Sequence, residues 1–249
     1  MVHSFLLVGQ SNAAGRGFLS DVEPIENPNC FTLRNGRWRG MYQPINPDRS
    51  SAGVNLAESF ADIYSREKGV KVGIIACADG GTCIDQWAVG SQLFEHAVAQ
   101  AKLAQRISTI TGILWHQGES DSREGRYDVY EGKLLRVIDG FRARLGLQNV
   151  PFLLGGLGDY LVNYPPPKFE KWDYINNVMQ KVATMRDRVG YVPADGLKPN
   201  PDNLHFSAPA LREFGVRYYK EFLKHENKEL VFEEKPMDGV IVTDEIELL

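Results

Sequence analysis

The sequence has little of three features that mark common protein classes. Its 249 residues include only three cysteines (Cys30, Cys77 and Cys83), with no CxxC or Cys/His spacing that suits a tetrahedral metal site. No apolar run approaches the roughly 20 residues that span a bilayer. Lys and Arg number 28 against 32 Asp and Glu, so the formal net charge is −4. We therefore expect reduced thiols, no metal, no membrane span and no nucleic-acid partner, which would need clustered basic residues.

The N-terminal glycines do not form a phosphate loop. In "GQSNAAGRG", Gly9, Gly15 and Gly17 fit neither GxGxxG nor GxxxxGK[ST], so a nucleotide-binding role is disfavoured. No basic segment and cleavage site come before the first apolar run. We expect a cytoplasmic protein, or a secreted one whose signal has been removed.

Apolar strand-like runs alternate with amphipathic helical runs along the chain. The expected strands are 3–9, 71–78, 111–117, 150–157 and 189–193, and the expected helices are 53–68, 91–106, 126–145, 173–188 and 208–225. Continuous apolar strands are buried on both faces, and strand-helix alternation implies parallel crossovers. This pattern predicts a three-layer α/β fold around a parallel sheet.

Two of these helices have the clearest signals. Apolar side chains recur at helical spacing in 53–68 and 126–145, as expected for faces packed on a core. Gly69 and Gly146 follow directly, where a glycine often ends a helix. We interpret the aromatic and leucine stripes as core.

Two segments do not fit the alternation. Residues 18–52 are rich in Pro, Asn and Arg and have a loop-like pattern. The tail 226–249 holds eight acidic residues and two lysines. It either adds an edge hairpin around "LVF" and "GVIV", offers a partner surface, or is a solvated extension, which is the preferred interpretation. We expect one domain over 1–225, followed by this acidic extension.

Polar and small residues stand where the expected strands end. Ligands of a parallel sheet bind beyond the carboxyl ends of its strands, because loops and helix N-termini meet there. The segments at these ends, together with the one before the last helix, are "GQSN" (9–12), "ADGGT" (78–82), "HQGESD" (116–121) and "DNLH" (202–205).

These segments contain the parts of a serine hydrolase. Serine becomes a nucleophile when an imidazole removes its proton, and an acid must hold that imidazole in the correct tautomer. Asp202 and His205 are three residues apart and can meet across one turn, with Ser11 as the nucleophile. Without these partners Ser11 would be interpreted as a helix cap.

An oxyanion needs hydrogen-bond donors that already point at it. The backbone N–H groups of Ser11 and of the Gly80-Gly81 pair suit this role, because glycine allows a close approach. A side-chain amide, from Gln117 or Asn12, could supply a third donor.

At this point the sequence resembles a known family. "GQSNAAG", "DGGTCIDQW", "WHQGESD" and "DNLHFS" resemble, in order and spacing, the four motif blocks of SGNH-type hydrolases. They look most like the carbohydrate acetylesterase branch, which includes acetylxylan esterases and sialic acid-specific 9-O-acetylesterases. The resemblance spans residues 6–207. It implies a flavodoxin-like αβα sandwich with a five-stranded parallel sheet, no cofactor and no metal, and acetylated carbohydrate as the substrate.

Carried over by block, the resemblance implies that Ser11 is the nucleophile, Gly81 an oxyanion donor, and Asp202 and His205 the acid and base. The third block departs from the general pattern, in which a glycine and an asparagine supply the oxyanion contact. The "HQGE" form of this branch makes Gln117 the expected third donor. Glu119 is an alternative acid for His205.

Several neighbouring residues have two interpretations each. Asn12 and Trp87 are candidate substrate-binding residues, although Trp87 could equally pack beneath its loop. Glu119 and Asp121 could form a capping pair or bind a cation. Arg16 either contacts an anionic sugar or faces water.

Two other functions use the same residues. A carbohydrate-binding module would keep the fold and bind sugar without turnover, but the presence of Ser11, Asp202 and His205 together argues against it. A lipase-like or thioesterase-like hydrolase would need an apolar groove, and 18–52 is too polar to form one. Short acyl groups are therefore expected.

Overall fold

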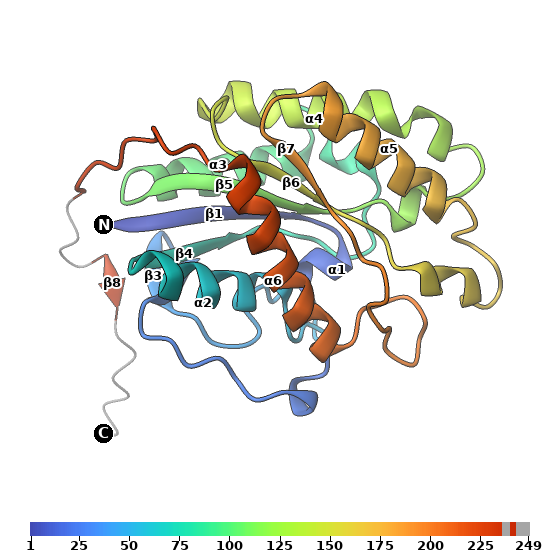
Figure 1. Cartoon of the computed structure of the whole chain (residues 1–249), viewed down its shortest axis with the longest axis horizontal. Helices are drawn as coiled ribbons and strands as arrows, with labels where there is room; N and C mark the ends of the chain where they lie inside the picture. The colour runs from blue at the N-terminus through green and yellow to red at the C-terminus, as the bar shows by residue number, and fades with distance from the viewer. Residues whose placement is uncertain (236–239, 243–249) are drawn as a thin grey trace.

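The computed structural model describes residues 1–235 and 240–242, and Figure 1 shows its layered arrangement. All five expected strands are present and pair in parallel, in the order β7-β6-β5-β1-β4. They are β1 (Val2–Gly9), β4 (Lys71–Ala76), β5 (Thr109–His116), β6 (Phe152–Gly155) and β7 (Val189–Val192). Strand β1 is buried along its whole length, as its continuous apolar pattern predicts.

Helices cover both faces of this sheet, so the predicted three-layer fold is confirmed. The expected number of five strands was too low, because shorter strands extend the sheet beyond β4 to eight strands within the described residues. Helices α2 (Leu56–Lys68) and α6 (Ala208–His225) pack together on one face. Helices α3 (Gln92–Gln105), α4 (Tyr130–Leu145) and α5 (Trp172–Met185) form the other layer. The apolar faces of these helices bury a core on each side of the sheet.

Capping fixes several helix ends as the sequence indicates. Asn55 and Glu58 form a reciprocal capping box at the start of α2. Helices α2 and α4 end at Gly69 and Gly146, which both take left-handed backbone conformations. The expected start of α2 at 53 was three residues early, because the chain before Asn55 is still extended.

The prediction of a loop-like segment at 18–52 was wrong in part. Strands β2 (Cys30–Arg34) and β3 (Arg37–Gly40) form an antiparallel hairpin there, and β2 continues the sheet beside β4. Asn35 and Gly36 make the turn, with φ values of 51° and 73°. Positive φ at both central residues is the geometry that two-residue hairpins require, and Asn-Gly supplies it at low cost.

The C-terminal tail contacts the sheet at two points. Strand β8 (Ile241–Val242) pairs in parallel with β3 and so adds to an edge, whereas residues 230–232 form no strand. The edge hairpin, one of the three interpretations of the tail, is therefore absent from the described residues, and 236–239 and 243–249 lie outside them. Phe232 instead stacks on His3, with ring centroids 3.8 Å apart.

Strand order determines where a ligand can bind. Strand β4 lies on one side of β1, and β5, which comes later in the chain, lies on the other side. The loops after these three strands therefore diverge and leave a crevice at the carboxyl edge of the sheet. The segments "GQSN", "ADGGT" and "HQGESD" all lie there.

Candidate active site

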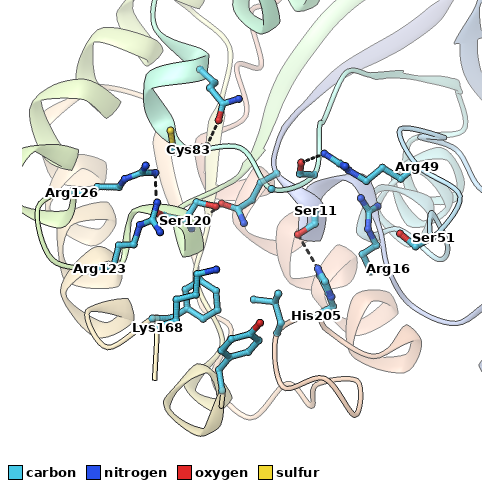
Figure 2. A pocket seen from close by; sticks show the side chains of 17 residues that line it. Ser11, Arg16, Arg49, Ser51, Cys83, Ser120, Arg123, Arg126, Lys168 and His205 are labelled. Carbon is cyan, nitrogen blue, oxygen red and sulfur yellow. Dashed lines mark hydrogen bonds between the residues drawn. The ribbon is translucent and has the colours of Figure 1, made fainter. Parts of the chain in front are cut away.

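Ser11 lies at the carboxyl end of β1, where the chain turns sharply into the short helix α1 (Ser11–Ala14). Gly9 allows the turn: its φ is +131°, and a side chain there would overlap the His116 carbonyl of the neighbouring strand. The side chain of Ser11 reaches the wall of an open pocket (Figure 2).

A chain of hydrogen bonds joins Ser11 to two residues from the loop before α6. The Oγ atom of Ser11 is 3.0 Å from Nε2 of His205 (Figure 2), and Nδ1 of His205 is 2.6 Å from Oδ2 of Asp202. The structure thus brings together three residues that are up to 194 positions apart in the sequence. These distances suit proton transfer from a hydroxyl to an imidazole that a carboxylate orients.

Local hydrogen bonds keep Asp202 ionised. Oδ1 of Asp202 accepts from the backbone N–H groups of Leu204 and His205, at 2.9 and 3.0 Å. Partial burial opposes ionisation, but these N–H groups and the His205 ring outweigh it and lower the pKa of Asp202. The carboxylate therefore remains an acceptor for the Nδ1–H of His205.

The loop after β4 presents a backbone donor to the same pocket. Gly81 lines the pocket with φ +78°, and no hydrogen bond within the described residues engages its N–H or that of Ser11. The N–H of Gly80 is occupied, because it donates to Oδ2 of Asp48 at 2.9 Å. Of the expected glycine pair, the geometry leaves the Gly81 N–H available.

The geometry does not support Gln117 as an oxyanion donor. Its side chain is fully buried, and its Nε2 group donates to Asp121 at 2.6 Å, to Gln10 at 3.1 Å and to the Thr82 carbonyl at 3.3 Å. Two N–H bonds cannot serve these acceptors and an oxyanion as well. Gln117 accordingly does not line the pocket.

The other residues of this block also point inward. Glu119 is 1% exposed and contacts Nε2 of His116 and Nδ2 of Asn12, not His205, so the alternative acid is not in position. Asp121 accepts from Gln117 and from the backbone N–H of Ile84. Both carboxylates thus have protein donors, and a cation role finds no support.

The two expected substrate-binding residues lie outside the pocket lining. Asn12 is 1% exposed, and its amide bonds Glu119 and the backbone of the His205 loop. Trp87 is fully buried, where its indole N–H donates to Thr82 and its ring packs edge-on against Trp115. Of the two interpretations of Trp87, packing beneath the loop is the one that the structure shows.

The pocket has a volume of about 520 Å³ and a basic lining. Five basic side chains and no described acidic side chain line it: Arg16, Arg49, Arg123, Arg126 and Lys168. Arg16 is paired with Asp48, 2.7 Å away, rather than solvated. Arg123, Arg126 and Lys168 form no ion pair within the described residues, and they stand across the pocket from Ser11 and His205 (Figure 2).

The sequence analysis did not predict the basic wall, which consists of Arg123, Arg126 and Lys168. Arg123 and Arg126 directly follow the "HQGESD" block at a spacing of three, which places both beyond the same strand end. Lys168 comes from the loop before α5 and has no comparable signal. Its position depends on how that loop folds back over the pocket.

The described residues offer neither a metal cluster nor a membrane helix. Within residues 1–235 and 240–242, no cluster of three or more His, Cys, Asp or Glu side chains could hold a metal ion. None of the helices described is long and apolar enough to cross a membrane. The three cysteines are free thiols, as predicted, and two of them are buried.

Comparisons with known proteins show which family the chain is similar to. A family model described as carbohydrate esterase, sialic acid-specific acetylesterase, matches residues 1–224. A probable carbohydrate esterase from Arabidopsis thaliana is 27% identical in an alignment 245 residues long that covers 89% of this chain and 90% of that protein.

Solved structures show the same fold. A protein from Arabidopsis thaliana superposes with a TM-score of 0.81 and 25% identity, over 90% of this chain and 99% of that one. NanS superposes with a TM-score of 0.69 and 16% identity, over 90% and 97% of the two chains. A lipase/acylhydrolase from Enterococcus faecalis has a TM-score of 0.56 at 11% identity, over 93% and 100% of the two chains, so it shares the αβα sandwich fold.

Proposed function

Because the chain belongs to the family of carbohydrate esterases described as sialic acid-specific acetylesterases, we propose that it cleaves acetyl esters through a covalent acetyl-serine at Ser11. The family makes the protein a carboxylic ester hydrolase that removes O-acetyl groups from carbohydrates. The observation that supports the covalent route is the Ser11–His205–Asp202 hydrogen-bond chain in the wall of an open pocket.

In the first step, Nε2 of His205 takes the proton of the Ser11 hydroxyl while Oγ attacks the acetyl carbonyl carbon. The carbonyl oxygen becomes an oxyanion that accepts from the N–H groups of Ser11 and Gly81. Each such donor contributes about 3 kcal/mol to transition-state stabilisation. The intermediate collapses when His205 protonates the sugar oxygen, and the sugar leaves with a free hydroxyl.

In the second step, water replaces the sugar. His205 accepts a proton from water, whose oxygen attacks the acetyl-Ser11 carbonyl, and the second oxyanion uses the same two N–H donors. Collapse returns the proton from His205 to Oγ of Ser11 and releases acetic acid, which loses its proton to the solvent and becomes acetate. Asp202 accepts from Nδ1–H of His205 throughout and stabilises the imidazolium that forms in each step.

The test of this mechanism is Ser11→Ala on p-nitrophenyl acetate. We expect a loss in kcat on the order of 10⁶-fold, as for other serine hydrolases that lose the nucleophile. Ser120→Ala is the matched control, because Ser120 lines the same pocket without contacting His205. Mass spectrometry of wild-type protein quenched during turnover should show an acetyl group on the peptide that contains Ser11. Retained activity in Ser11→Ala would refute the proposed nucleophile.

The basic wall favours an acidic sugar as the natural substrate. Arg123, Arg126 and Lys168 have no carboxylate partner within the described residues, and an arginine fork matches the geometry of a carboxylate. A sialic acid type substrate carries such a group, whereas the acetylated backbone of xylan is neutral. We therefore place 9-O-acetyl sialic acid before acetylated xylan.

Substitution of the basic wall separates these substrates. Arg123→Gln with Arg126→Gln should reduce kcat/KM for 9-O-acetyl sialic acid at least tenfold, or about 1.4 kcal/mol, and leave p-nitrophenyl acetate within about twofold. Equal losses on both substrates would argue against carboxylate recognition. Absence of turnover in the wild type, together with sugar binding, would favour the binding-module alternative. Faster cleavage of p-nitrophenyl octanoate than of the acetate would favour the lipase-like alternative.

A further inference from the structure

Three buried side chains connect the loop before α6 that carries His205 (the base loop) to the turn after β1 that carries Ser11 (the nucleophile turn). We propose that Asn12, Glu119 and His116 form a buried brace that positions His205 relative to Ser11, and this inference rests on the proposed function. All three side chains are at most 1% exposed, so they contact neither substrate nor water in the pocket. They are positioning residues rather than catalytic ones.

Asn12 holds the backbone on both sides of His205. Its Oδ1 accepts from the N–H of Phe206 at 3.1 Å, and its Nδ2 donates to the carbonyl of Leu204 at 3.2 Å. Asn12 also directly follows Ser11 in α1. One rigid amide therefore sets the distance between the nucleophile turn and the segment that carries the base.

Glu119 determines which way the Asn12 amide faces. Nδ2 of Asn12 donates to Oε1 of Glu119 at 2.6 Å. An ionised carboxylate only accepts hydrogen bonds, so it selects the NH₂ end of Asn12 and leaves Oδ1 for Phe206. If the Asn12 amide were flipped, its Oδ1 would face the Glu119 carboxylate, which is also an acceptor, and its NH₂ group would face the Phe206 N–H, which is also a donor.

His116 keeps Glu119 ionised and in place. Burial opposes ionisation of Glu119, but the His116 ring and the hydrogen bonds from His116 and Asn12 outweigh it and lower the pKa of Glu119. Nε2 of His116 is 3.1 Å from the same Oε1 atom. The His116 ring also packs edge-on against Phe206, with centroids 5.6 Å apart, and so contacts the base loop directly.

The brace gives a role to residues of two motif blocks that take no part in the catalytic steps. "GQSN" supplies Asn12 beside the nucleophile, and "WHQGESD" supplies His116 and Glu119 at the end of β5. Two segments of the chain meet at the Glu119 carboxylate, and Asn12 links them to a third, the loop that carries His205. A displacement of about 1 Å in such a site can cost about 100-fold in rate, so positioning of this kind has a measurable effect.

Asn12→Ala and Glu119→Gln test the brace. Glu119→Gln preserves the side-chain volume but allows either amide orientation at Asn12. We expect a fall in kcat for p-nitrophenyl acetate of about 100-fold in Asn12→Ala and at least tenfold in Glu119→Gln, with KM within about twofold. All rates are expressed per folded molecule, with the folded fraction measured by near-ultraviolet circular dichroism.

Asn176→Ala is the matched control, because Asn176 is also buried and bridges the backbone N–H and carbonyl of one residue, Leu157, away from the pocket lining. It should lower the melting temperature but keep kcat within about threefold of wild type, as expected for a residue that contributes only to stability. If Asn12→Ala and Glu119→Gln behave like Asn176→Ala, the brace is refuted. Ser11→Ala is measured in parallel, so that failure of the proposed nucleophile is seen separately.

Hydrogen exchange in the wild-type protein tests the brace without any variant. The Phe206 N–H is buried and bonded to Asn12, so its NMR signal should exchange at least 100-fold more slowly than an unstructured amide. Exchange at the unstructured rate would refute the brace, even if both variants fail to fold.

Discussion

Asp48 connects the loop after β4, which holds Gly80 and Gly81, to the rest of the protein, and its removal should lower the stability of the fold. Oδ1 and Oδ2 of Asp48 accept from the two terminal nitrogens of Arg16 at 3.0 and 2.7 Å, and Oδ2 also accepts from the Gly80 N–H. Both side chains of the ion pair are 6% exposed. Asp48→Ala would leave the Arg16 charge buried without a partner, and the backbone N–H next to Gly81 without an acceptor.

The magnitude follows from this burial. Breaking a buried ion pair by removing one partner costs about 3 to 5 kcal/mol, because the remaining charge stays desolvated. For a chain of this length, each kcal/mol lowers the melting temperature by about 2 to 4 °C, so we expect a decrease of about 6 to 20 °C. Replacing both partners, Arg16→Met with Asp48→Leu, leaves no buried charge and should unfold at a higher temperature than Asp48→Ala.

Asp139→Ala is the control for this experiment. Asp139 makes the same two-pronged contact with Arg186, at 3.0 and 2.9 Å, but the two side chains are 50% and 35% exposed. A surface pair contributes about 0 to 1 kcal/mol, so its loss should lower the melting temperature by less than about 4 °C. Circular dichroism melts of the variants, with kcat measured at 25 °C, complete the assay. Equal shifts for Asp48→Ala and Asp139→Ala would refute the argument from burial.

Three further predictions concern the base, pH and thiols. Asp202→Asn should lower kcat by about 10⁴-fold, because an amide favours the wrong imidazole tautomer, and a tenfold loss or less would refute this role. Burial lowers the pKa of His3 from 6.5 to about 4. As the pH falls, the unfolded chain therefore takes up a proton at His3 before the folded protein does. The free energy of unfolding, measured by urea titration, should decrease on the order of 3 kcal/mol between pH 6.5 and 4, and this decrease should be absent in His3→Gln. Burial raises the pKa of Cys30 and Cys77 to about 12. One thiol, that of Cys83, should therefore react quickly with a maleimide at pH 7, and its modification should block the pocket in wild type but not in Cys83→Ser.

Periodicity predicts the parallel sheet because each of its central strands is buried on both faces and needs a continuous apolar run. The β2–β3 hairpin lacks that signal. Its two strands lie toward a sheet edge, are only five and four residues long, and contain Arg34, Arg37 and Arg39, so the segment lacks the continuous apolar run of the central strands. The turn itself was recognisable, since Asn35-Gly36 between two short β-branched or aromatic segments is a strong hairpin signal.

The residues that meet at the pocket could be predicted in part. A serine nucleophile requires an imidazole base, and that imidazole requires an acid. Spacing and motif order are therefore enough to predict that Ser11, His205 and Asp202 act together. Gln117 and Asn12 have amides that can bind an oxyanion, a substrate or the protein itself. The choice depends on the direction in which a turn sends the side chain, and a pattern of residue types does not contain that direction. In both cases the protein itself is the partner.

Net charge predicts long-range attraction but not the lining of a pocket. The chain carries −4 overall, yet the pocket gathers five cations from segments as far apart as Arg16 and Lys168. Salt screens exposed charges beyond about 8 to 10 Å, so a small ligand inside the pocket interacts mainly with this local group. Under the proposed acidic-sugar specificity, rising salt should therefore weaken binding of the acidic sugar more than turnover of a neutral ester.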